Sequence, residues 1–154
     1  MDISNGEGIG VALFVQGCHF HCYNCFNPET WDFNGGKEWI QEVEDKFIEL
    51  ASRPYIQRIS ILGGEPLADE NLDGVLKLVN KFRLLFPDKT IWLYTGYTWE
   101  DIFMYDKQTS NSNVLVFFEE NVIKAYKRCR NPFSHIGFIG FTILNNSHYH
   151  LFSH

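Results

Sequence analysis

The chain has 154 residues, of which 45% are hydrophobic and 21% charged, a balance typical of one globular domain with one core. Its formal net charge of -6, without a local run of Lys and Arg, argues against nucleic-acid binding, which needs a basic surface. The first residues lack the order of a signal peptide, and no apolar run reaches the length of a membrane span. We therefore expect residues 1–154 to form a single cytoplasmic domain with neither a nucleic-acid nor a membrane partner.

The first predicted strand covers residues 10–17, where an apolar run containing β-branched residues ends at a glycine. A cysteine-rich segment, residues 18–25, follows directly and is expected to be a loop. After a glycine turn at residues 34–36, apolar residues at helical spacing predict an amphipathic helix over residues 38–52. Pro54 is expected to end that helix.

A second strand and helix are predicted next in the chain. Residues 56–62 have the apolar pattern of a strand, which leads into a Gly-Gly-Glu-Pro sequence at residues 63–66. Apolar residues at helical spacing over residues 72–86 predict a second helix, which Pro87 closes. Residues 90–95 are expected to form a third strand.

The pattern is less regular in the last third of the chain. A short helix is predicted over residues 98–104, and a polar stretch at residues 107–113 is expected to be a loop. A strand over residues 114–118 and a helix over residues 120–128 should follow. The apolar run at residues 136–144 predicts a final strand, since it is too short to cross a membrane.

The alternation of strands and helices predicts an α/β fold with a mainly parallel sheet. A complete eight-unit barrel takes about 250 residues, so this chain is too short for one. The predicted fold is therefore a partial, open (β/α) barrel. Ligands collect at the carboxyl ends of the strands in such sheets, where the cysteine segment and the Gly-Gly-Glu-Pro sequence should be neighbours.

Cys18, Cys22 and Cys25 are spaced by three residues and then by two. Cysteines in a cytosolic protein indicate metal or redox chemistry more often than disulfides. A loop with this spacing can wrap three thiolates around one face of a 4Fe–4S cluster, which leaves one iron without a protein ligand. That open iron could bind S-adenosylmethionine (SAM) through its amino and carboxylate groups and reduce its sulfonium.

A zinc site is the alternative interpretation of these cysteines. His19, His21 or Cys129 would complete the four ligands of a tetrahedral zinc ion. Structural zinc sites usually carry two pairs of ligands, however, and the sequence shows no second pair. The three cysteines alone therefore favour a cluster with an open iron, and we expect Cys129 to be a bystander.

The Gly-Gly-Glu-Pro sequence offers a second candidate site. Gly63 and Gly64 allow the backbone to approach a ligand closely, and the Glu65 carboxylate can accept hydrogen bonds from an ammonium group. This chemistry suits the amino group of SAM. The alternative is an ordinary strand-to-helix turn, with Pro66 starting the helix.

The joint pattern of Cys-x3-Cys-x2-Cys and Gly-Gly-Glu resembles the radical SAM superfamily. More narrowly, it is similar to the activating proteins of anaerobic ribonucleoside-triphosphate reductase. The resemblance covers residues 1–100 and does not extend to residues 107–154. The matching stretches are residues 5–9, 13–18, 25–31, 63–67 and 91–97.

The resemblance implies that the three cysteines hold a 4Fe–4S cluster and that Gly63, Gly64 and Glu65 hold the SAM amino group. Further candidates for the SAM pocket are Tyr23, Asn24 and Thr95, although many superfamily members have an aromatic residue where this chain has Asn24. The implied activity is radical transfer to a glycine of the large reductase subunit, with an electron from a flavodoxin-like or other low-potential donor. The alternatives are another radical SAM enzyme, acting on a different glycyl radical enzyme or a small molecule, and a non-catalytic zinc-binding module.

Overall fold

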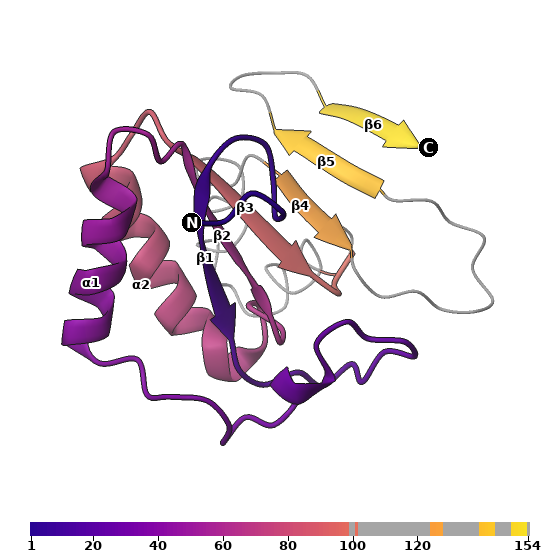
Figure 1. Ribbon diagram of the computed structural model, residues 1–154. Helices are drawn as coiled ribbons and strands as arrows, with labels where there is room; N and C mark the ends of the chain where they lie inside the picture. Colours follow the sequence, from indigo (N-terminus) through magenta and orange to yellow (C-terminus); the bar gives the residue numbers. More distant parts are fainter. Residues whose placement is uncertain (99–100, 102–123, 128–138, 144–148, 154) are drawn as a thin grey trace.

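The computed structural model describes residues 1–98, 101, 124–127, 139–143 and 149–153. Within them the chain forms one six-stranded sheet in the order β1-β2-β3-β4-β5-β6 (Figure 1). The strands are β1 (Gly10–Val15), β2 (Arg58–Gly63), β3 (Thr90–Thr95), β4 (Lys124–Lys127), β5 (Ile139–Ile143) and β6 (Tyr149–Ser153). The pairings from β1 to β4 are parallel, and those from β4 to β6 are antiparallel.

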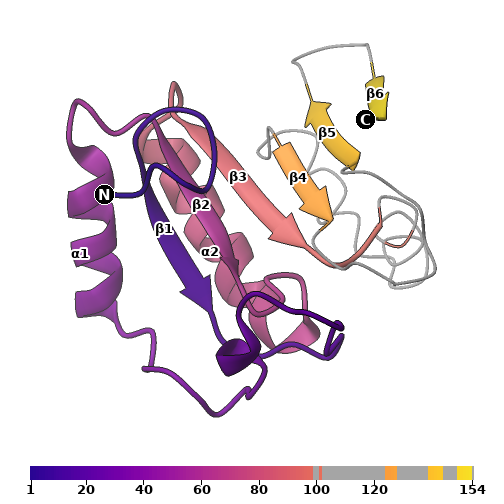
Figure 2. The same cartoon turned by 45° about the vertical axis from the view of Figure 1, so that its right-hand side comes forward.

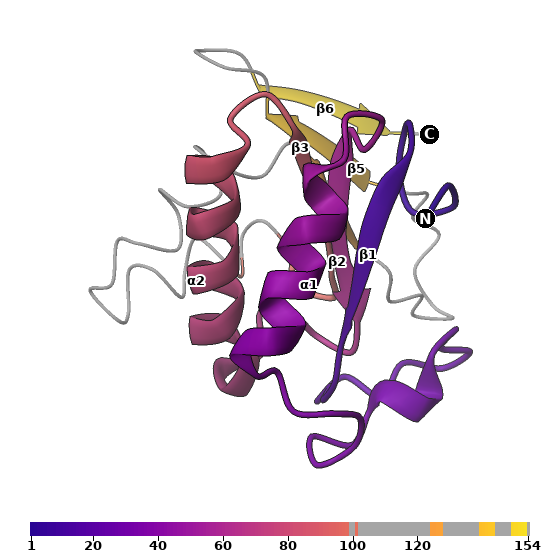
Figure 3. The same cartoon turned by 60° about the vertical axis from the view of Figure 1, so that its left-hand side comes forward.

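Two helices, α1 (Gln41–Ser52) and α2 (Asp69–Leu85), lie on the same face of the sheet (Figure 3). Each helix connects two neighbouring parallel strands, and the strand order advances in one direction. Crossovers of one hand then necessarily place both helices on one face. β1 and β2 pair from Gly10–Arg58 to Val15–Gly63, so their carboxyl ends finish level.

The hydrophobic core lies between this sheet and the two helices. It is formed by apolar side chains that alternate along the strands and recur at helical spacing on α1 and α2. Its fully buried members include Ala51, Ile59, Ile61, Val79, Phe82, Ile91 and Leu93. This core packs β2 and β3 against the two helices, which support the strands up to their carboxyl ends.

The N-terminal loop covers the other face of β2. Arg58, which is 0% exposed, forms an ion pair with Asp2 at 2.8 Å and donates a hydrogen bond to the carbonyl of Glu7 at 3.1 Å. Burial opposes ionisation of Asp2, but hydrogen bonds from Arg58 and Ser4 outweigh it and lower the pKa of Asp2. A buried guanidinium is thus satisfied by the segment that precedes β1.

The sequence predicted the α/β class, the first three strands and both helices within a few residues at their ends. The predicted helix at residues 120–128 is wrong, because residues 124–127 form β4 and pair with β3. β5 confirms a strand within residues 136–144, although it runs antiparallel to β4, and β6 was not predicted (Figure 2). The partial barrel remains a prediction.

Several predictions fall outside the described residues. These are most of the helix at residues 98–104, the loop at residues 107–113 and the strand at residues 114–118. Cys129 also lies outside the described residues. In the described part of the chain, neither helix combines the length and the apolar character that crossing a membrane requires.

Candidate functional site

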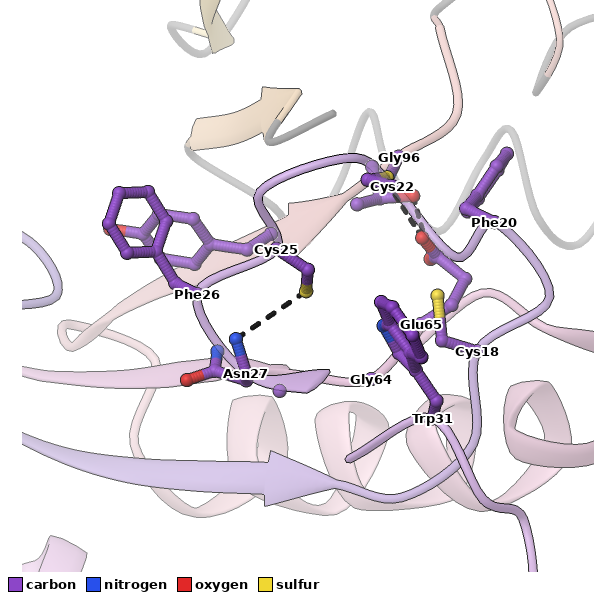
Figure 4. A pocket seen from close by; sticks show the side chains of 13 residues that line it. Cys18, Phe20, Cys22, Cys25, Phe26, Asn27, Trp31, Gly64, Glu65 and Gly96 are labelled. Atoms are coloured by element: carbon purple, nitrogen blue, oxygen red, sulfur yellow. Dashed lines mark hydrogen bonds between the residues drawn. The ribbon is translucent and has the colours of Figure 1, made fainter. Parts of the chain in front are cut away.

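The cysteine segment and the ends of β2 and β3 meet at one cavity (Figure 4). Its lining includes all three cysteines of the sequence pattern, together with Gly63, Gly64, Glu65 and Thr95. The sequence predicted that the two motifs would be neighbours because both follow parallel strands, and this is confirmed. The loop that carries the cysteines lies beyond the carboxyl ends of β1 and β2 (Figures 1 and 2).

The cysteine loop turns sharply twice. His21 and Asn24 have φ angles of 43° and 56°, in the left-handed region. Asparagine tolerates this region, whereas histidine adopts it less often. A turn hydrogen bond of 3.1 Å from Cys25 N–H to the Cys22 carbonyl closes the second bend. These bends bring to one cavity three thiols whose residues are separated by four and then three positions.

Cys18 is the most firmly anchored of the three. Its backbone N–H donates to the Trp31 carbonyl at 3.1 Å, and Gly17 N–H donates to the Thr30 carbonyl at 2.8 Å. Burial raises the pKa of the Cys18 thiol, and the negative charges of Glu65 and Cys25 add to the shift. Coordination to a metal would reverse this preference, because a metal deprotonates the thiol that binds it.

The redox state of the cysteines bears on metal binding. Cys18 and Cys25 are free thiols. Asn27 N–H donates a weak hydrogen bond of 3.4 Å to the sulfur of Cys25. Among the described residues, no three His, Cys, Asp or Glu side chains are already gathered to hold a metal ion. In the described structure the three cysteines thus line one cavity without forming a preassembled metal site.

Glu65 joins the ends of two strands. It is 2% exposed, and its Oε1 accepts hydrogen bonds from Leu67 N–H at 2.9 Å and the Thr95 hydroxyl at 2.7 Å. Its Oε2 accepts from Gly96 N–H at 2.7 Å. Burial raises the pKa of Glu65, although these three hydrogen bonds act in the opposite direction. Both oxygens already have protein donors, so the carboxyl group serves first to hold the β2 and β3 ends together.

The two glycines are required by the approach of the cysteine loop. Gly63 has a φ of +106°, and a Cβ built there would lie 2.7 Å from the Val15 carbonyl oxygen. A Cβ on Gly64 would overlap the carbonyl group of Gly17, the residue before the first cysteine. The close backbone approach that the sequence predicted is therefore made by the chain itself. It places Cys18 directly beside the end of β2.

Asn71 was not singled out by the sequence, but it links the same elements. From the first turn of α2, its Nδ2 donates to the carbonyls of Gln16 and Glu65, both at 2.9 Å. The β1 end, the β2 end and α2 are thereby connected through one side chain. A single asparagine in a helix gives no sequence signal of such a role.

The remaining predicted pocket residues differ in their placement. Thr95 is 3% exposed and lines the cavity, where its hydroxyl binds Glu65. Tyr23 is 70% exposed, and within the described part of the chain neither it nor Asn24 lines the cavity. The structure adds Asn27, Trp31 and Tyr94 to the lining. Their contribution depends on how the loop folds back, which the sequence pattern does not specify.

The two loop histidines bear on the zinc alternative. His19 Nε2 lies 3.0 Å and 3.1 Å from the two carboxylate oxygens of Glu70, and its ring packs 4.5 Å from that of Phe33. The ring of His21 packs edge-on against Trp31 at 4.7 Å. His19 is thus held by an acidic partner outside the cavity. This placement disfavours His19 as a fourth ligand beside the cysteines.

Comparison with known proteins identifies the family of the chain. A family model described as a 4Fe-4S single cluster domain matches residues 4–133. The anaerobic ribonucleoside-triphosphate reductase-activating protein of Salmonella typhi is 40% identical over 119 residues, which cover 75% of this chain and 77% of that protein. The chain belongs to this family of activating proteins. The resemblance inferred from the sequence is thereby confirmed.

Other activating proteins of the family show similar agreement. That of Vibrio cholerae is 43% identical over 100 residues, and the match spans 64% of this chain and 64% of that relative. That of Escherichia coli strain K12 is 39% identical over 104 residues, or 66% of this chain and 68% of the relative. No solved structure matches the chain significantly.

Proposed function

We propose that this chain is a radical SAM activase. It would cleave SAM reductively at a 4Fe–4S cluster and generate a glycyl radical on the large subunit of anaerobic ribonucleoside-triphosphate reductase. The observation that carries the proposal is the single cavity lined by all three cysteines and by the Gly-Gly-Glu turn. The names of the relatives and the matched 4Fe-4S family model support the same function.

In this proposal Cys18, Cys22 and Cys25 would hold the cluster, and the iron left without a cysteine would be available to the amino and carboxylate groups of SAM. When bound and reduced, the cluster supplies the electron that breaks a carbon–sulfur bond of SAM, giving methionine and a 5′-deoxyadenosyl radical. Gly63 and Gly64 would hold the amino group at the carboxyl end of β2. Glu65 keeps this end in place through its bonds to Thr95 and Gly96.

The proposed target is a glycine of the reductase. Its Cα hydrogen atom would pass to the 5′-deoxyadenosyl radical, leaving 5′-deoxyadenosine and a glycyl radical stored on the partner. A flavodoxin-like or other low-potential donor would supply one electron for each cleavage. Phe26 lines the cavity and is 80% exposed, so the cavity mouth presents an apolar ring to an approaching chain.

The test is anaerobic reconstitution of the full chain with iron and sulfide, followed by addition of SAM, a reductant and a candidate reductase. We expect 5′-deoxyadenosine and an electron paramagnetic resonance (EPR) signal of a glycyl radical that requires both SAM and this protein. Formation of 5′-deoxyadenosine without the glycyl radical would point to another radical SAM substrate. A colourless protein with one zinc per chain and no SAM cleavage would refute the proposal.

A further inference from the structure

The indole N–H of Trp31 has no hydrogen-bond acceptor among the residues that the structure describes, although the nitrogen is buried. Burying an unpartnered donor is unfavourable, and such groups are rare in folded proteins. Trp31 also lines the cavity with the three cysteines. Figure 4 shows its side chain among those that line the cavity with Cys18 and Cys25. The donor is therefore placed at the candidate cluster site.

The indole is held in this position by its neighbours. Trp31 follows the short 3-10 helix η1 (Pro28–Thr30), and its N–H donates to the Pro28 carbonyl at 3.2 Å. Its own carbonyl accepts from Cys18 N–H at 3.1 Å. The ring of His21 packs against it at 4.7 Å. The hydrogen bonds hold the backbone of Trp31 beside that of the first cysteine, and the ring of His21 packs against the indole.

The acceptors that the cavity offers to this N–H are limited. The carboxylate oxygens of Glu65 already accept from Leu67, Thr95 and Gly96. An indole can only donate, and thiolate or sulfide sulfur can accept. Backbone N–H of Asn27 already points to the sulfur of Cys25 at 3.4 Å, so the segment after the third cysteine directs one donor at a ligand sulfur.

We propose that Trp31 Nε1–H donates a hydrogen bond to a sulfur of the bound 4Fe–4S cluster or its thiolates and thereby raises the reduction potential of the cluster. Hydrogen bonds to cluster sulfur disperse the negative charge that reduction adds, which makes reduction easier. Trp31 is then a positioning and tuning residue that acts through the cluster. The inference rests on the proposed cluster function and assigns it a residue outside the ligand set.

The test compares Trp31→Phe with Trp39→Phe in the full, reconstituted chain. Trp39 is a matched control because its indole N–H donates to Glu44 Oε2 at 3.1 Å, away from the cavity. Both variants should retain the wild-type iron and sulfide content. Potentiometric titration followed by EPR should show a lower midpoint for Trp31→Phe alone. At the wild-type midpoint, we expect the ratio of reduced to oxidised cluster to fall roughly threefold to tenfold, tenfold corresponding to about 59 mV.

A second measurement starts from the wild-type chain, so its first outcome does not depend on whether a variant folds. In protein labelled with ¹⁵N-tryptophan, pulsed EPR of the reduced cluster should detect a nitrogen coupling. That coupling should persist in Trp39→Phe and vanish in Trp31→Phe. An absent coupling in the wild type, or an unchanged midpoint in an iron-loaded Trp31→Phe, would overturn the inference while leaving SAM cleavage intact. A wild-type chain that binds no cluster would overturn the inference together with the proposed function.

Discussion

The cavity has two walls that are held in different ways. The cysteine wall, residues 17–31, depends on backbone turns, and it exposes 70% of Tyr23 and 80% of Phe26. The strand-end wall, residues 63–66 with Thr95 and Gly96, depends on buried hydrogen bonds to Glu65, which is 2% exposed. Weakly packed loops adapt at low energetic cost, whereas a buried network keeps one geometry. The difference suits a loop that closes on a cluster against a wall already in place.

The largest expected effect comes from the cysteine wall. Cys25→Ala removes one iron ligand, so SAM cleavage should be abolished and iron content should fall. The stability of the metal-free protein should change little, because Cys25 lies outside the hydrophobic core. Iron analysis, 5′-deoxyadenosine formation and thermal unfolding measure the three quantities.

Cys18→Ala and Cys22→Ala should abolish cleavage in the same way. Cys129→Ala is the control and should leave the iron content unchanged. Retained cleavage in any of the three ligand variants would show that the residue does not bind the cluster.

The next effect tests the contact between the two walls. Gly64→Ala forces a Cβ against the carbonyl group of Gly17, and we expect destabilisation of about 1–3 kcal/mol with reduced iron loading. Urea unfolding of the metal-free chain measures the free energy of unfolding.

Gly74→Ala is the matched control, because a Cβ on this α2 glycine meets no atom within 4 Å. Alanine there should stabilise the helix by up to about 1 kcal/mol. Equal unfolding midpoints for wild type and Gly64→Ala would show that the close approach of Gly64 to Gly17 does not contribute to stability.

A smaller effect is expected from the link between α2 and both walls. Asn71→Ala leaves the carbonyls of Gln16 and Glu65 without this donor. It should lower the free energy of unfolding by about 1 kcal/mol. Asn71→Asp keeps the shape of the side chain but places a carboxylate oxygen against two carbonyl oxygens. Because these oxygens repel one another, it should lower the free energy of unfolding by more than Asn71→Ala does. Urea unfolding would contradict the assignment if both variants matched the wild type.

The smallest expected effect is a pH dependence in the metal-free chain. Burial raises the folded pKa of Glu65 above its ordinary 4.5, so the unfolded chain loses this proton first as the pH rises. The free energy of unfolding should therefore fall as the pH rises from the ordinary pKa through the raised folded pKa. Glu65→Gln, measured by urea unfolding at the same pH values, should lack that part of the slope. An identical slope in both proteins would assign it to other groups.

Much of the fold followed from local patterns. The apolar runs predicted β1, β2 and β3, and helical spacing predicted α1 and α2 within a few residues at their ends. The failure at β4 has a physical reason. Residues 124–127 can adopt a helix by intrinsic preference, but hydrogen bonds along β3 hold them extended. The sequence of these four residues does not indicate that they pair with β3.

The sequence by itself determined that three thiols and a Gly-Gly-Glu turn meet at one edge of a parallel sheet. Ligand spacing and strand periodicity are local properties, and strand ends in parallel sheets are necessarily neighbours. Only the tertiary structure decided that Glu65 is held by Thr95 and Gly96, that Gly64 lies beneath Gly17, and that Trp31 enters the cavity. These contacts depend on strand register and on the path of a loop between distant residues, which local preferences do not encode.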